Sequence, residues 1–224
     1  MTQESPALEV VDLWVRLAGN PVLRGVSLRV GRGATVALVG PNGAGKTTTL
    51  RAIMGLVPAT GEVRLGGHSL QGSAAHRRAR RGLGYAPEDR RLIAAFTVED
   101  NLLLPARACG LGRQGARQRL AHVLSLLPEV EALCGRWATT LSGGQQKMVT
   151  LARALMAGHR ALLLDEPFQG LAPALARRYA EALVRLRASE PELAILVTES
   201  NPALVESLAA HTYTLERGEI AAPA

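Results

Sequence analysis

A glycine-rich turn in the first quarter of the sequence has the residue types that bind a nucleotide phosphate chain. It follows the apolar run ATVALV, precedes a helical pattern, and fits GxxxxGK[ST] in the strand–loop–helix context which that motif requires. Its glycines let backbone N–H groups surround phosphate oxygens at a helix N-terminus. The residues of this phosphate loop that we expect to bind nucleotide are Gly40, Pro41, Asn42, Gly43, Ala44, Gly45, Lys46, Thr47 and Thr48. Lys46 is expected to reach the β- and γ-phosphates, and the Thr47 hydroxyl to ligate Mg²⁺.

Two adjacent carboxylates, Asp165 and Glu166, follow an apolar run in the sequence ALLLDEP. Such a run is typical of a buried strand that carries polar groups to the ligand edge of a parallel sheet. Asp165 is then expected to hold Mg²⁺, and Glu166 to orient or deprotonate the water in phosphoryl transfer to water. The alternative is a strand end with solvated acids, which the phosphate loop elsewhere in the chain disfavours.

A second glycine turn, LSGGQQ at 141–146, also precedes a helical pattern. Ser142 and Gln145 form an S-x-x-Q capping box, so one account is simply the start of a helix. Capping does not explain Gly143 and Gly144, which weaken a first helical turn but leave backbone N–H groups open to an anion. Because the phosphate loop already encloses one face of a nucleotide, we interpret the second glycine turn as closing the other face from another copy of the domain.

Short apolar runs and amphipathic patterns supply the elements that would position these groups. Strands are expected at 26–30, 34–39, 62–65, 161–164, 194–198 and 211–215. Helices are expected at 45–56, 97–110, 115–127, 142–156 and 174–189. Strands dominate the first third, helices the middle, and strand–helix–strand units the end, which indicates an α/β core with a helical insertion.

The composition narrows the class of protein without choosing a ligand. The formal charge of +7 permits nucleic acid, an anionic membrane surface or small anions as partners. Cys109 and Cys134 form no CxxC pair, which favours neither a disulfide framework nor a zinc site and fits a reducing compartment. No apolar run approaches the roughly 18 residues of a membrane span, so other subunits are expected to do any spanning.

The phosphate loop, LSGGQQ and LLLDEP, in this order and spacing, resemble the ATP-binding subunit of an ABC transporter. The resemblance implies a P-loop NTPase core, a RecA-like mixed sheet with flanking helices and an antiparallel β subdomain, at 1–86 and 159–224. A helical signature subdomain would occupy 87–158.

The resemblance also implies ATP and Mg²⁺, ATP hydrolysis, and a head-to-tail homodimer or a heterodimer with a sister subunit. In that dimer Ser142 and Gly144, with Gly143 and Gln145 beside them, would approach the γ-phosphate held by Lys46 of the other subunit. The further partners implied are integral membrane permease subunits at the cytoplasmic face of the inner membrane, and no nucleic acid is expected.

A narrower resemblance rests on residues 85–102 (YAPEDRRLIAAFTVEDNL), 170–173 (GLAP) and 199–204 (ESNPAL). These segments resemble the subgroup that serves uptake of branched-chain amino acids, amides or urea with a solute-binding protein. In that subgroup a glutamate often replaces the glutamine that joins the Mg²⁺ and water site to the membrane subunit. Glu88 matches that position, and Arg90 and Arg91 would lie near the contact.

Glu88 itself departs from the pattern of most relatives, and its extra negative charge near the γ-phosphate would raise the barrier unless Mg²⁺ offsets it. The chain departs from the family pattern at two further positions. Leu17 stands where an aromatic residue usually stacks on adenine, and Trp14 comes three residues early. Either adenine is held by apolar contact alone or the register bends. Ser200 stands where most relatives carry a histidine that contacts the γ-phosphate.

Two other functions compete with an ATPase that drives transport. An ATP-driven clamp that dimerises but scarcely hydrolyses is compatible with Leu17 and Ser200, although Glu166 argues against it. A nucleic-acid ATPase of the same superfamily is compatible with the basic charge. Such proteins resemble two fused copies or a core split by long coiled coils, and this chain has neither pattern.

Overall fold

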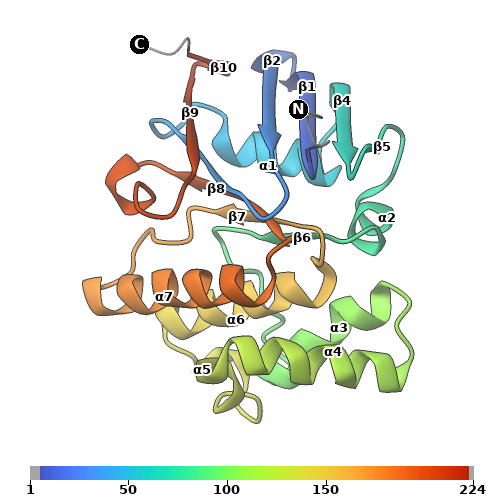
Figure 1. The fold of residues 1–224 in the computed structure, drawn as a ribbon, viewed down its shortest axis with the longest axis vertical. Coiled ribbons are helices and arrows are strands. Elements are labelled where there is room, and N and C mark those ends of the chain that lie inside the picture. The colour runs from blue at the N-terminus through green and yellow to red at the C-terminus, as the bar shows by residue number, and fades with distance from the viewer. Residues whose placement is uncertain (1–5, 222–224) are drawn as a thin grey trace.

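The apolar runs of the sequence form two sheets in the computed structural model, which describes residues 6–221 (Figure 1). The larger sheet has the strand order β10-β9-β3-β8-β7-β6, with parallel pairing from β9 to β6 and an antiparallel edge strand β10. Its strands are β3 (Thr35–Val39), β6 (Leu83–Ala86), β7 (Ala161–Asp165), β8 (Ala194–Glu199), β9 (His211–Glu216) and β10 (Glu219–Ile220). Every residue of β3, β7 and β8 is buried, as expected for central strands covered on both faces.

The smaller sheet is antiparallel, with the order β2-β1-β4-β5. Its strands are β1 (Leu8–Leu17), β2 (Asn20–Val30), β4 (Thr60–Leu65) and β5 (His68–Ser69). Helix α1 (Lys46–Met54) contacts strands of both sheets, and one apolar core of α1, β1, β2 and the larger sheet fills the space between them. The phosphate loop that precedes α1 is therefore fixed between two sheets.

Helices cover the other face of the larger sheet, as Figure 1 shows. The helices of the chain after α1 are α2 (Ala75–Arg80), α3 (Val98–Ala108), α4 (Arg113–Leu126), α5 (Pro128–Glu131), α6 (Gly143–Ala157) and α7 (Pro173–Ser189). Two 3₁₀ turns, η1 (Ala138–Thr140) and η2 (Pro202–Leu204), complete the order. Within residues 6–221, no helix has the length and apolarity that crossing a membrane requires.

The expected fold class is confirmed, and the five expected helices match α1, α3, α4, α6 and α7 to within a few residues. The elements that were not expected are the strands β1, β5, β6 and β10, the first half of β2, the helices α2 and α5, and the two 3₁₀ turns. β1 has irregular pairing with both neighbours, which interrupts the alternation of apolar and polar residues that reveals a strand. β6 has four residues and contains Gly84, so its sequence carries little strand signal.

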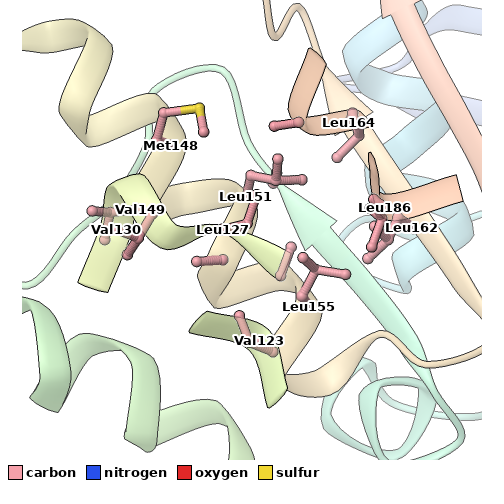
Figure 2. Close-up of a cluster of buried hydrophobic side chains, with 14 of the residues drawn as sticks. Val123, Leu127, Val130, Met148, Val149, Leu151, Leu155, Leu162, Leu164 and Leu186 are labelled. Carbon is pink, nitrogen blue, oxygen red and sulfur yellow. The ribbon is translucent and has the colours of Figure 1, made fainter. Parts of the chain in front are cut away.

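A second apolar core joins the helices to the larger sheet (Figure 2). The figure shows side chains of α4, α5 and α6 packed together, with Leu162 and Leu164 of β7 and Leu186 of α7 beside them. Ser142 caps α6 through a complete capping box, so the second glycine turn leads directly into the helix that this core holds. Its position relative to the sheet is therefore set by buried apolar packing.

The core predicts a strong contrast between two positions of α7. Leu186 is fully buried, whereas Val184 on the same helix is 56% exposed. Leu186→Ala should lower the free energy of unfolding by about 2–5 kcal/mol through lost burial and a cavity. Val184→Ala should change it by no more than about 0.5 kcal/mol. Urea unfolding of both variants measures this, and equal effects would contradict the packing described.

Candidate functional site

The phosphate loop connects the end of β3 to the start of α1. Gly43 and Gly45 have φ of 81° and 111°, a left-handed conformation that favours glycine. A Cβ at Gly45 would also lie 2.7 Å from Leu23 Cδ2, so that side chain would have to shift to admit it. The sequence thus has glycine where the turn demands it.

A pocket of about 430 Å³ opens above this loop. Its lining residues are Val22, Asn42, Gly43, Gly45, Lys46, Thr47, Thr48, Glu88, Glu166 and Gln169. We call this the nucleotide pocket. Six of the nine expected phosphate-loop residues border it, together with Glu88 and Glu166. Leu17, Asp165, Ser200 and the residues of the second glycine turn are not among its lining residues, and Val22 and Gln169 were not expected there.

Lys46 and Glu166 form a buried ion pair at the base of the nucleotide pocket. Lys46 Nζ lies 3.0 Å from Glu166 Oε1, and the two side chains are only 5% exposed. The ammonium also donates to Gly40 O at 2.6 Å and to Ser200 Oγ at 3.1 Å. Burial alone would raise the pKa of Glu166, but the hydrogen bond from Ser200 and the charge of Lys46 outweigh it and hold that pKa below its usual value. Glu166 is therefore ionised at neutral pH.

Ser200, which follows β8, joins this pair to the phosphate loop. Its Oγ lies 2.6 Å from Glu166 Oε1 and 2.9 Å from Asn42 Oδ1, and its N–H donates to Glu166 Oε2 at 3.3 Å. The residue identified from the family pattern thus contacts both proposed catalytic side chains. The Ser200 hydroxyl accepts a hydrogen bond from Lys46 and can donate one to Glu166. A movement of Lys46 can therefore alter the hydrogen bond between Ser200 and Glu166.

Asp165 holds the hydroxyl of Thr47 at the adjoining strand end. Thr47 Oγ1 donates to Asp165 Oδ1 at 2.9 Å, Thr198 Oγ1 lies 3.1 Å from the same oxygen, and Tyr85 OH donates to Oδ2 at 3.0 Å. Burial raises the pKa of Asp165, and these hydrogen bonds partly offset it. Tyr85 and Thr198 were not expected at the site, since only the pairing of β6, β7 and β8 brings them to Asp165.

The second glycine turn lies on α6, and its residues are not among those that line the nucleotide pocket of the same chain. Ser142 and Gly143 are exposed, whereas Gly144 is buried. A Cβ at Gly144 would lie 2.5 Å from Leu175 Cδ1 of α7, so helix packing gives one reason for this glycine. Gln145 completes the capping box. Within one chain, then, the two glycine turns are separate.

The segment after β6 is attached to α6 through two arginines. Glu88 borders the nucleotide pocket, and Arg90 Nη1 donates to Gln146 Oε1 of α6 at 2.9 Å. Arg153, also of α6, donates to the backbone oxygens of Arg90 and Arg91. The segment that carries Glu88 is therefore fixed to the helix of the second glycine turn.

Leu17, at the end of β1, is 39% exposed and is not among the residues that line the nucleotide pocket. Trp14 borders a different surface depression with Pro58 and Thr60, and its Nε1 donates to Asp12 Oδ1 at 2.7 Å. Val22, on the neighbouring strand β2, is the apolar residue of this hairpin that borders the pocket. No aromatic side chain is among the pocket's lining residues.

A phosphate loop between a strand and a helix, with a buried carboxylate at the end of another strand of the same parallel sheet, is typical of a P-loop nucleotide-binding protein. Residues 23–169 match the family model described as ABC transporter. The chain belongs to this family, as an ABC transporter ATP-binding subunit. Subunits of this kind are ATPases coupled to transport, work with membrane permease subunits and are peripheral to the membrane.

Relatives in the family serve different transport systems. The chain is 33% identical over 201 residues to the probable branched-chain amino acid transport ATP-binding protein LivF of Archaeoglobus fulgidus, covering 89% of this chain and 84% of that protein. It is 34% identical over 217 residues to the lipopolysaccharide export system ATP-binding protein LptB of Acidithiobacillus ferridurans, covering 96% and 89%. Among solved structures, an ATP-binding cassette of an ABC transporter in its ADP conformation matches with a TM-score of 0.81 at 26% identity, covering 97% of this chain and 90% of that one.

The buried ion pair predicts a coupled loss of stability. Lys46→Met leaves the Glu166 carboxylate buried without its cation, so it should lower the free energy of unfolding by about 3 kcal/mol. In a Glu166→Gln background, Lys46→Met should lower the free energy of unfolding clearly less, because the glutamine leaves no unpaired buried charge. A double-mutant cycle by urea unfolding measures the difference, and equal costs in both backgrounds would contradict the pairing.

Glu199 predicts a pH dependence of stability. Burial and the nearby Glu166 raise its pKa to about 7, although the N–H of Phe168 donates to it at 2.9 Å and opposes this. The folded protein therefore keeps a proton that the unfolded chain releases, and stability falls as pH rises toward 7. Glu199→Gln, which is always neutral, should be more stable than wild type at pH 8 by on the order of 2 kcal/mol and gain little at pH 5. Thermal unfolding at both pH values tests this, with Glu181→Gln, at an exposed position of α7, as the control. A gain in stability that does not grow with pH would contradict the prediction.

Proposed function

We propose that this subunit hydrolyses ATP in a head-to-tail pair with a second ATP-binding subunit and so drives uptake of branched-chain amino acids or related small polar solutes. The observation that carries the catalytic part is the mutual contact of the Lys46, Glu166 and Ser200 side chains. The solute class is supported by the similarity to LivF and by residues 85–102, 170–173 and 199–204. The similarity to LptB makes lipopolysaccharide export the competing substrate.

The described arrangement suggests how ATP would switch the site on. Lys46 is now satisfied by Glu166 and by loop carbonyls. A γ-phosphate carries more negative charge than Glu166 and would compete for the ammonium. Glu166 would then be free to accept a hydrogen bond from the attacking water, which its ionised state allows. Ser200 would remain beside both groups in place of the histidine of most relatives.

The oxygen atoms around Asp165 fit a magnesium ion. Thr47 Oγ1 and Asp165 Oδ1 are oxygen atoms of the kind that ligate Mg²⁺, and they lie 2.9 Å apart. Thr47 and Glu88 both border the nucleotide pocket. Bound there, Mg²⁺ would neutralise charge on the phosphates. We propose Thr47 and Asp165 as ligands, with Glu88 as a further one that also faces the membrane subunit.

The second glycine turn requires a second subunit in this proposal. Ser142 and Gly143 are exposed and separate from the nucleotide pocket of their own chain, so they are available to close another one. We propose that residues 87–158 act as the helical signature subdomain around residues 1–86 and 159–224. The permease would sit against this assembly at the cytoplasmic face of the inner membrane, with a solute-binding protein supplying the solute.

Reconstitution in proteoliposomes tests the proposed function. The wild-type subunit, with its permease subunits and solute-binding protein, should show ATP-dependent uptake of labelled leucine. Glu166→Gln should bind ATP yet lower both hydrolysis and uptake by ~10²-fold or more, because the water loses its oriented base.

Three other results would change the conclusion. Hydrolysis without leucine uptake would contradict the solute class. Hydrolysis that survives Glu166→Gln would contradict the role of this carboxylate. Tight ATP binding with negligible hydrolysis by the wild-type assembly would favour the clamp.

A further inference from the structure

Lysine is rare in this chain, and both lysines meet at Glu166. Of the 26 Lys and Arg residues only two are lysines, Lys46 and Lys147. Both are buried to 5% exposure, and no arginine appears among the buried charged residues of the described chain. Lys46 pairs with the side chain of Glu166, and Lys147 Nζ donates to its main-chain oxygen. Glu166 is therefore contacted by two lysine ammonium groups, one from α1 and one from α6.

Lys147 comes from α6, the helix that begins at Gly143 in the second glycine turn. Burial lowers its pKa, while the charges of Glu199, Glu88 and Glu166 favour the ammonium and Arg90 opposes it. A buried amine needs an acceptor to offset lost hydration. The acceptor it finds is the carbonyl that follows the strand end of β7.

The backbone of Glu166 is strained, and its neighbours hold it in place. Its φ is 46°, a left-handed value that costs a residue with a side chain on the order of 1–3 kcal/mol. Its N–H lies 3.2 Å from both the carbonyl oxygen and Oγ1 of Thr198. Its carbonyl accepts from Lys147 and from the N–H of Gln169 at 3.2 Å. Gln169 belongs to the same turn, so among these bonds only Lys147 connects Glu166 to α6.

We propose that Lys147 is a positioning residue that fixes the strained backbone of Glu166 and links the second glycine turn of each subunit to the catalytic carboxylate of that same subunit. Because α6 starts at the turn that closes the partner's nucleotide, a shift of α6 on that nucleotide would move the carbonyl of Glu166. A lysine suits this contact because its compact ammonium can donate to a single oxygen in a small space, where a planar guanidinium has no second acceptor to match. The inference rests on the proposed roles of Glu166 and of the second glycine turn.

Two substitutions of Lys147 test the link in the purified subunit. Lys147→Met keeps the length and apolar stem but removes the donor, and should lower kcat for Mg-ATP hydrolysis by roughly tenfold or more through misplacement of the carboxylate. The affinity for a fluorescent ATP analogue should stay within about twofold, because Lys46 and the phosphate loop are unchanged. Lys147→Gln keeps a neutral donor and should recover part of the lost kcat. Thr150→Val, a buried change one turn along α6 that does not touch Glu166, should leave kcat near wild type.

Each contrary result has a distinct meaning. A kcat of Lys147→Met within about twofold of wild type would overturn the proposal. So would a joint loss of nucleotide affinity, kcat and thermal stability, which would make Lys147 a purely structural residue. Equal kcat for the Met and Gln variants would assign the effect to lost charge, against the proposed hydrogen bond. Failure of the proposed function would show separately, as absent hydrolysis by the wild-type subunit in the complete transporter used for the uptake assay.

Discussion

The ion pair between Lys46 and Glu166 is the interaction on which the rest of the site depends. It exists because β3, β7 and β8 are parallel neighbours, so the loops that follow them meet at one edge of the sheet. Two buried charges are stable there only while each satisfies the other. Each of the two charges is therefore neutralised by the other in the described site. A phosphate that entered would offer Lys46 a more negative partner and would compete with Glu166 for the ammonium.

A second constraint comes from α6. Gly143 at its start is exposed, its body is buried against α3, α4 and the sheet, and Arg153 joins it to the segment after β6. One rigid helix thus contacts Glu166 through Lys147 and holds the segment of Glu88 through Arg153. In a packed core such contacts shift together rather than singly. The helix is therefore well placed to couple the position of the Glu166 carboxylate to that of the segment that carries Glu88.

Much of this could be predicted from the sequence because it is encoded locally. The phosphate loop, the acidic end of β7 and the capped start of α6 each lie within about ten consecutive residues, and five helices follow from their periodicity. What could not be predicted depends on contacts between distant segments. Tyr85 reaches Asp165 only because β6 pairs with β7, Lys147 reaches Glu166 only through the packing of α6, and Val22 borders the pocket only because β2 lies beside the phosphate loop. The placement of Leu17 outside the pocket likewise depends on the hairpin of β1 and β2, whose irregular register no local pattern reveals.

The central claim is that the second glycine turn of one subunit completes the nucleotide pocket of another, and a complementation assay tests it most directly. Lys46→Ala and Ser142→Arg subunits, each inactive alone, are mixed and their Mg-ATP hydrolysis is compared with the wild type. The account predicts recovery of roughly a quarter of wild-type activity, since half of the pairs are mixed and each mixed pair contains one intact site. A mixture no more active than its components, with an active wild type, would show that the site lies within one chain and would contradict the account.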